Sequence, residues 1–91
     1  MSQVIEAGVP INLTSSGAIS LSPGNLLGFY VNSTSSGTIV LKDGGASGTA
    51  ISGTITPAIG FHRYPAYFRS ASGAYATLAN TIDVTFFFAG G

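Results

Sequence analysis

The side chains able to carry acid-base or metal chemistry are few in this sequence, and they lie far apart. The 91 residues include no cysteine and a single histidine, His62. The three acids are Glu6, Asp43 and Asp83. A zinc site needs three or four ligands, and catalysis by a carboxylate pair needs two acids to converge in one pocket. We therefore expect no catalytic residue, no metal site and no bound cofactor.

Serine is abundant, but no serine stands in a pattern that is typical of a nucleophile. The Gly-x-Ser-x-Gly signature of a nucleophile elbow does not occur. The run Gly44-Gly-Ala-Ser-Gly48 has the glycines of a phosphate-binding loop, yet neither a Lys-Ser/Thr ending nor a helix follows it. A turn explains this run better, and the sequence as a whole predicts a protein that is not an enzyme.

One segment, residues 61–69, combines four aromatic residues with both arginines of the chain. Tyr and Arg are enriched where protein interfaces make their strongest contacts. This segment therefore supplies most of the candidate interface residues, namely Arg63, Tyr64, Tyr67 and Arg69. The alternative is that Phe61 and Phe68 belong to the core, and that Pro65 marks an edge strand or a bulge.

The same segment also admits a carbohydrate-binding interpretation. Tyr64 and Tyr67 offer flat apolar faces for sugar rings, and an arginine can donate hydrogen bonds to hydroxyl groups. Sites of this kind usually add Asp, Asn or Gln acceptors, and none flanks this segment. The acceptors would have to come from elsewhere in the chain, such as Asn32 or Asn80.

The C-terminal segment, residues 81–89, alternates apolar and other residues as a half-buried strand does. The residues expected on its core face are Ile82, Val84, Phe86 and Phe88. Phe87 then lies on the opposite face, and a strand with apolar residues on both faces is hazardous at an open sheet edge. We therefore expect a central strand or an obligate interface, in which a second sheet or a neighbouring subunit covers Phe87, the fifth candidate interface residue.

The composition also indicates contact with neighbouring molecules. Only 7% of the residues are charged, against about 25% in an average soluble domain, and 45% are hydrophobic. A chain of net charge +0 lacks the repulsion that keeps small proteins apart in solution. Three cations, Lys42, Arg63 and Arg69, are too few for nucleic acid binding, and no apolar stretch reaches the roughly 20 residues that span a membrane. We expect the partners to be proteins.

Turn-forming residues recur every eight to twelve residues or so, which is typical of short strands joined by turns. About eight strands are predicted, at residues 10–14, 18–22, 26–32, 37–43, 49–56, 61–67, 74–78 and 81–89. We expect one all-β domain over residues 1–91, an antiparallel β-sandwich or jelly roll with almost no helix. A partly open barrel is the nearest alternative. Gly8 and Pro10 favour a flexible or anchoring N-terminal arm over residues 1–10.

The second half of the chain, residues 37–88, resembles small virion-surface proteins of tailed double-stranded DNA bacteriophages. The likeness rests on an ordered series of strand and turn motifs. They are Gly37-Thr-Ile-Val-Leu-Lys-Asp-Gly-Gly, Ser47-Gly-Thr, Thr56-Pro-Ala-Ile-Gly-Phe-His, Tyr64-Pro-Ala-Tyr-Phe, Gly73-Ala-Tyr-Ala-Thr-Leu and Asp83-Val-Thr-Phe-Phe-Phe. Each motif by itself is common among β proteins, so their order carries the specificity.

The resemblance implies a head decoration, cement or fibre-base protein that forms homo-oligomers, most often trimers. It also implies binding to the major capsid protein or another virion protein, and a location on the virion after synthesis in the host cytoplasm. An adhesion or receptor-binding module for host-surface glycans is the alternative function. Residues 1–30 match no part of such proteins, and the resemblance assigns no role to any single residue.

Overall fold

The computed structural model describes residues 8–90, which form one antiparallel sheet of six strands. Two long strands, β3 (Gly24–Asp43) and β6 (Ala74–Gly90), pair along their whole length. The four shorter strands are β1 (Val9–Leu13), β2 (Gly17–Ser20), β4 (Thr49–Ala50) and β5 (Gly60–Phe68). The predicted all-β class is confirmed, since residues 8–90 contain no helix.

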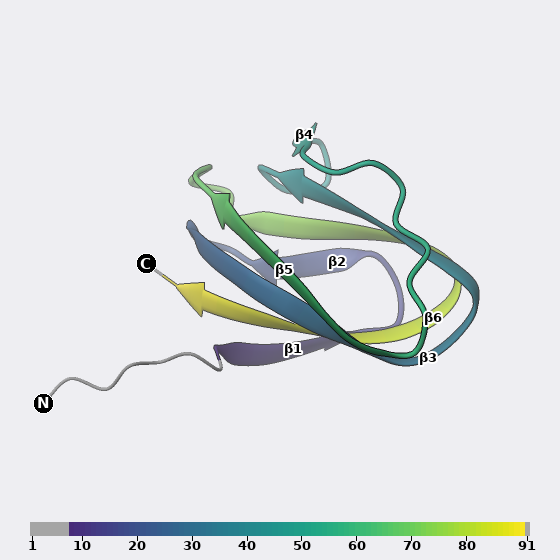
Figure 1. Ribbon diagram of the computed structural model, residues 1–91. Helices are drawn as coiled ribbons and strands as arrows, with labels where there is room; N and C mark the ends of the chain where they lie inside the picture. Colours follow the sequence, from purple (N-terminus) through teal and green to yellow (C-terminus); the bar gives the residue numbers. More distant parts are fainter. Residues whose placement is uncertain (1–7, 91) are drawn as a thin grey trace, which may run out of the picture.

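Each half of the two long strands has its own short strands beside it. β1 pairs with the C-terminal half of β6 and β5 with the N-terminal half of β3, and we call these four strand segments the first half-sheet. β2 pairs with the N-terminal half of β6 and β4 with the C-terminal end of β3, which gives the second half-sheet. Figure 1 shows β3 and β6 curving round between them, so that the two half-sheets face each other.

The long strands β3 and β6 each join two strands that the sequence predicts separately, namely 26–32 with 37–43 and 74–78 with 81–89. Ser36 and Asn80 have left-handed backbone conformations, with φ of 57° and 62°, and two residues of β3 face Thr81 at this bulge. The Asn80 side chain donates a 2.7 Å hydrogen bond to the Ser36 carbonyl oxygen. A bulge bends paired strands without ending them, which is why fewer strands form than the sequence predicts.

The predicted strand 49–56 is wrong for most of its length. Only Thr49–Ala50 forms β4, and beyond it Ile55 pairs with Ile39 in an isolated bridge with N–O distances of 2.9 and 2.8 Å. The Ser52 hydroxyl oxygen accepts a 2.9 Å hydrogen bond from the Leu41 N–H, so a side chain takes the place of the backbone carbonyl that a continuing strand would supply. Residues 51–59 instead cross irregularly from β4 to β5 (Figure 1).

The core lies between the two half-sheets and consists of apolar side chains that alternate with outward-facing ones. Its members are Ile19, Leu26, Phe29, Val31, Ile39, Leu41, Phe68, Ala74, Ala76, Ile82, Val84, Phe86 and Phe88. The four predicted core residues of β6 are each at most 3% exposed, so the predicted register of this strand is confirmed. Of the two alternatives expected for this strand, the structure shows the central position, because β6 lies between β1 or β2 on one side and β3 on the other.

The predicted N-terminal arm is only partly within the described residues. Residues 1–7 lie outside them, whereas Val9 and Pro10 pair with Phe88 and Phe87 as part of β1. The last residues of the predicted arm therefore belong to the sheet.

Candidate interaction surface

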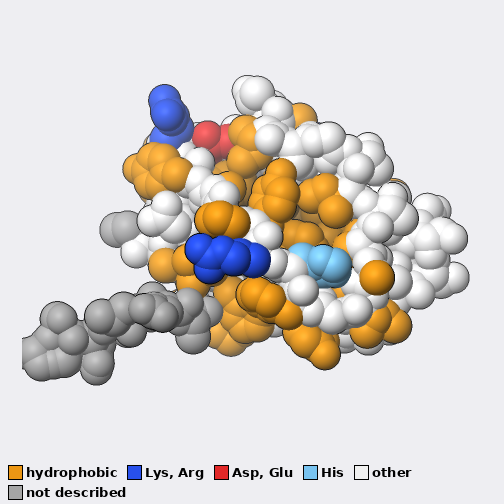
Figure 2. Space-filling model, in the orientation of Figure 1, with side chains coloured by type: hydrophobic (Ala, Val, Ile, Leu, Met, Phe, Trp, Pro, Cys, Tyr) orange, Lys and Arg blue, Asp and Glu red, His pale blue; other side chains and the backbone are white. Residues whose placement is uncertain are grey.

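The outer face of the first half-sheet, which points away from the core, carries aromatic side chains from three strands. Tyr30 of β3 is 43% exposed and Phe61 of β5 is 57% exposed, and these residues are partners in the strand register. Phe87 of β6 is half-buried, and its ring centroid lies 6.1 Å from that of Phe61. We call these three residues the aromatic centre. Figure 2 shows apolar side chains gathered on this part of the surface, below the histidine.

Gly28 forms the floor of the aromatic centre. Its partners in the strand register are Phe87 on one side and Arg63 on the other. A Cβ atom at this position would lie 3.0 Å from Cζ of Phe61 and 2.5 Å from the carbonyl oxygen of His62. Only a glycine therefore leaves room for the Phe61 ring to lie across β3 and reach Phe87.

β5 distributes the candidate interface residues over two faces, because successive side chains of a strand alternate. Arg63 and Tyr67 point outward, and Tyr67 is 59% exposed. Tyr64 lies on the inner face, half-buried against the core, with its ring centroid 6.3 Å from that of Phe29. Tyr64 is therefore not part of the exposed surface predicted for it, and it cannot share one sugar ring with Tyr67.

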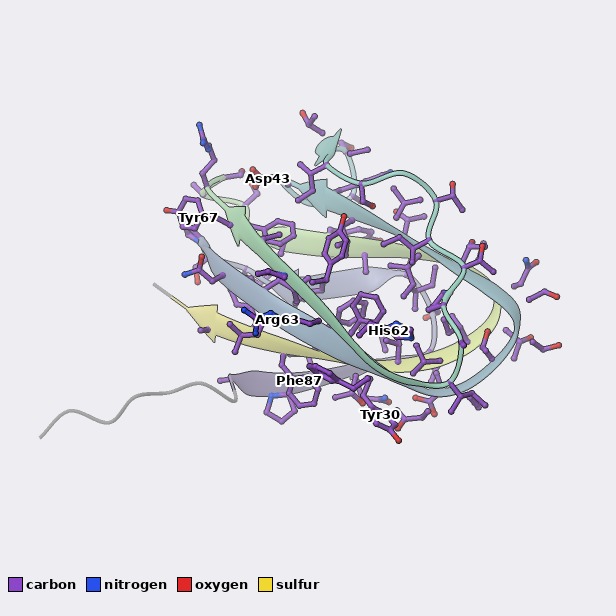
Figure 3. All side chains as sticks on the ribbon, in the orientation of Figure 1. Tyr30, Asp43, His62, Arg63, Tyr67 and Phe87 are labelled. Atoms are coloured by element: carbon purple, nitrogen blue, oxygen red, sulfur yellow. The ribbon has the colours of Figure 1, made fainter. Side chains whose placement is uncertain are left out.

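The other two candidates, Arg69 and Phe87, lie on opposite sides of β3, because Arg69 follows β5 and Phe87 belongs to β6. Arg69 follows β5, where its amide nitrogen and that of the next residue lie 3.4 and 3.0 Å from the Asp43 carboxylate oxygens. Figure 3 shows Tyr67 near Asp43 at this end of β5, and Phe87 on the other side of Arg63. The structure thus places Arg63 and Phe87 on either side of Gly28, whereas Tyr67 and Arg69 lie further along β5 and beyond it.

The sequence pattern alone does not single out Tyr30, and the alternative that places Phe61 in the core is wrong. Phe68 is fully buried as that alternative predicts, whereas Phe61 is 57% exposed. The two residues are separated by an odd number of positions, so the period of two along a strand puts them on opposite faces. This alternation is the signal that identifies Phe61 as outward-facing.

A polar cluster adjoins the aromatic centre on the same face. Asn12 Nδ2 donates hydrogen bonds to Asp83 Oδ1 at 2.7 Å and to Thr85 Oγ1 at 3.1 Å. Asn32 Nδ2 donates to the same two oxygens, at 3.2 and 3.1 Å. These four residues of β1, β3 and β6 form the Asp83 cluster, and it lies beside Tyr30 because Tyr30 and Thr85 are register partners. The shared hydrogen bonds hold the four side chains in fixed orientations.

His62 has a structural environment on the inner face of β5. Its ring centroid lies 5.3 Å from that of Phe29, and its Nε2 atom lies 2.7 Å from the Ala58 carbonyl oxygen. This hydrogen bond joins β5 to the irregular segment 51–59. Among residues 8–90, no three His, Cys, Asp or Glu side chains lie together as a possible set of metal ligands.

Replacement of His62 by alanine is expected to destabilise the protein by about 1–2 kcal/mol, because it removes one hydrogen bond and one aromatic contact. Hydrogen exchange of the amides in segment 51–59 should accelerate more than exchange in β6. Thr56→Ala, an exposed change in the same segment, is the control and should cost less than about 0.5 kcal/mol. Unchanged exchange in segment 51–59 of His62→Ala would contradict the anchoring role.

Comparison of the chain with known protein families, with curated protein sequences and with solved structures finds no match. Within the described part of the chain, no helix has the length and apolar character needed to cross a membrane. What the outer face offers to a partner therefore follows from its own chemistry, which is the aromatic centre, the Asp83 cluster and Arg63.

Proposed function

We propose that this chain is a structural protein that associates with copies of itself and with a larger assembly. The observation that carries the proposal is the aromatic centre, where Tyr30 and Phe61 leave 43% and 57% of their surface exposed. Complete removal of an apolar side chain of this size from water contributes about 1.5–3 kcal/mol, and roughly half of that remains to be gained at each of these half-exposed rings. With 7% charged residues, little repulsion opposes the approach of another protein surface.

Association also compensates for the small size of the chain. A domain of this length buries only about 60% of the surface that its unfolded chain exposes, which leaves a narrow margin of stability. A specific interface takes about 800 Å² from each partner, roughly a sixth of the 4888 Å² accessible here. Because only the folded chain can form such an interface, association stabilises the folded state by mass action.

We further propose that the larger assembly is the particle of a tailed double-stranded DNA bacteriophage. The resemblance of residues 37–88 to virion-surface proteins motivates this, and the curved sheet supports it. Two facing half-sheets around one core are comparable to the layers of a β-sandwich or jelly roll. In this role the protein decorates or stabilises the particle by binding the major capsid protein or another virion protein, and a trimer is the homo-oligomer that the resemblance favours.

The first test of this proposal is the solution mass of the purified protein, measured by light scattering over a dilution series. The expected result is an oligomer that persists on dilution, with a trimer as the state that the resemblance favours, and a monomer at every concentration would overturn self-association. The virion role is tested separately by mass spectrometry of purified phage particles. The protein should be present in stoichiometric amounts, and its absence from particles would overturn that role.

A module that binds host-surface glycans is the second candidate function, and the Asp83 cluster favours it. Sugar-binding sites combine an apolar ring face with oriented polar groups, and the cluster lies beside the exposed ring of Tyr30. Saccharide titration followed by NMR should then shift the side-chain amide signals of Asn12 and Asn32. The amide of Asn80, which hydrogen-bonds Ser36 at the bulge, is the internal control. No selective shift with any saccharide would remove this candidate.

A further inference from the structure

The outer face of the first half-sheet carries a positive charge and a negative charge on opposite sides of the aromatic centre. Arg63 is linked through its register partner Gly28 to Phe87, and Asp83 lies four residues before Phe87 on β6. The two charged residues are therefore separated by about 13 Å along the strands and by about 10 Å across them. They are too far apart to pair within one chain.

The aromatic centre lies between these two charges, and Thr85 is the polar residue between Phe87 and Asp83 on β6. Tyr30 and Phe61 are register partners, and the Phe61 ring extends over Gly28 toward Phe87. Figure 3 shows Arg63, Phe87 and Tyr30 on neighbouring parts of the sheet. An apolar middle with polar and charged groups around it is the composition of a protein interface.

The edges of this half-sheet are less suited to association than its face. β1 and β5 are its outer strands, and they contain Pro10 and Pro65, respectively. Proline lacks the N–H group that a strand from another chain would need, so it protects an edge against further pairing. The alternative that Pro65 marks an edge strand or a bulge is confirmed, because β5 is an edge strand and its register with β3 shifts there.

We propose that this outer face docks on the same face of a second copy of the chain, with Arg63 of one copy opposite Asp83 of the other. The inference rests on the self-association proposed above and assigns it to a surface. Each copy offers both members of the charge pair, so the face is complementary to itself and joins two copies about a twofold axis. A dimer is the oligomer that this contact forms by itself, and a larger oligomer needs a second, different contact. The two aromatic centres then meet between the charges and are removed from water. Asn12 and Asn32 hold the Asp83 carboxylate in position for the incoming guanidinium.

The test compares the Arg63→Asp variant with the unmodified protein. Light scattering over a dilution series measures the concentration at which each oligomer dissociates. Two facing carboxylates repel each other, so the dissociation concentration should rise by about tenfold or more relative to the unmodified protein. The double variant Arg63→Asp/Asp83→Arg exchanges the two charges and should recover most of this loss. Lys42→Asp makes the same charge change outside this face, where the lysine Nζ hydrogen-bonds the Ala46 carbonyl oxygen, and should leave dissociation unchanged.

A further single variant tests the same docking face if the double variant does not fold. Asp83→Asn keeps an oxygen acceptor for Asn12 and Asn32 but removes the charge, so it should weaken association without changing the circular dichroism spectrum. An oligomer that Arg63→Asp and Asp83→Asn leave intact would overturn this docking face and leave self-association standing. A monomeric unmodified protein would overturn both, and selective shifts of Asn12 and Asn32 with a saccharide would then identify a glycan as the occupant.

Discussion

Phe86→Ala is expected to lower the free energy of unfolding by about 3–5 kcal/mol, because it removes a large side chain from a closely packed core. Phe86 is fully buried, and its ring centroid lies 5.7 Å from that of Phe29. Small domains have a total stability of about 5–10 kcal/mol, so the variant should be close to unfolding at room temperature. Urea denaturation followed by circular dichroism, at one fixed protein concentration, measures the difference.

The matched control is Phe87→Ala, which removes the same atoms one position further along β6. Phe87 faces outward and is half-buried, so its truncation should cost about 1 kcal/mol of folding stability. Equal losses for the two variants would contradict the orientation of β6. Thr85→Ala, although also an outward-facing change on β6, is a less suitable control for Phe86→Ala. It would remove a hydroxyl oxygen that accepts hydrogen bonds from Asn12 and Asn32.

Gly73→Ala is expected to cost about 2–4 kcal/mol, because both the backbone conformation and the surroundings of this residue exclude a side chain. Gly73 has φ of 83°, and a Cβ atom there would overlap the Ser20 carbonyl oxygen and lie 2.7 Å from the Ser22 nitrogen. Its carbonyl oxygen also accepts a 2.9 Å hydrogen bond from Gly44. The residue thus joins the turn before β6 to the turns after β2 and β3. Thermal unfolding should show a clearly lower midpoint.

Gly53→Ala provides the control for this substitution. Gly53 lies in segment 51–59, its φ is not positive, and no atom lies within 4 Å of the position that a Cβ would occupy. The change should therefore be neutral or slightly stabilising, because alanine restricts the unfolded chain more than glycine does. Similar losses at positions 53 and 73 would mean that the close packing around Gly73 is not what limits substitution.

The strand registers could be predicted from the sequence wherever apolar and polar residues alternate without interruption. Ile82 to Phe86 is such a stretch, and its period of two, continued to Phe88, gives the inward residues that are buried in the structure. The same rule separates Phe61 from Phe68 on β5. The bulge at Ser36 and Asn80 was not predictable in this way, because Ser and Asn are also common in turns and nothing local shows that the two strands stay paired.

The outer face could be predicted only in part, since its groups come from four strands. Arg63 and Phe87 are the predicted residues that meet there, whereas Tyr64 faces inward. The Asp83 cluster combines Asn12 and Asn32 with Asp83 and Thr85, which lie more than fifty positions further along the chain. Such contacts depend on which strands are neighbours, and alternation within a strand carries no information about that.

By itself, the sequence determined the class of the fold, the inward and outward residues of its clearest strands, and the scarcity of charge that favours contact with other proteins. These properties are local or compositional. The period of two along a strand and the polarity of each residue do not depend on which strands lie beside it. The tertiary structure decided which strands lie side by side, and therefore where Tyr30, Phe61, Phe87 and the Asp83 cluster come together. Pairing of strands distant in sequence depends on closing long loops and on how the bent sheet packs around one core, and no local pattern specifies either.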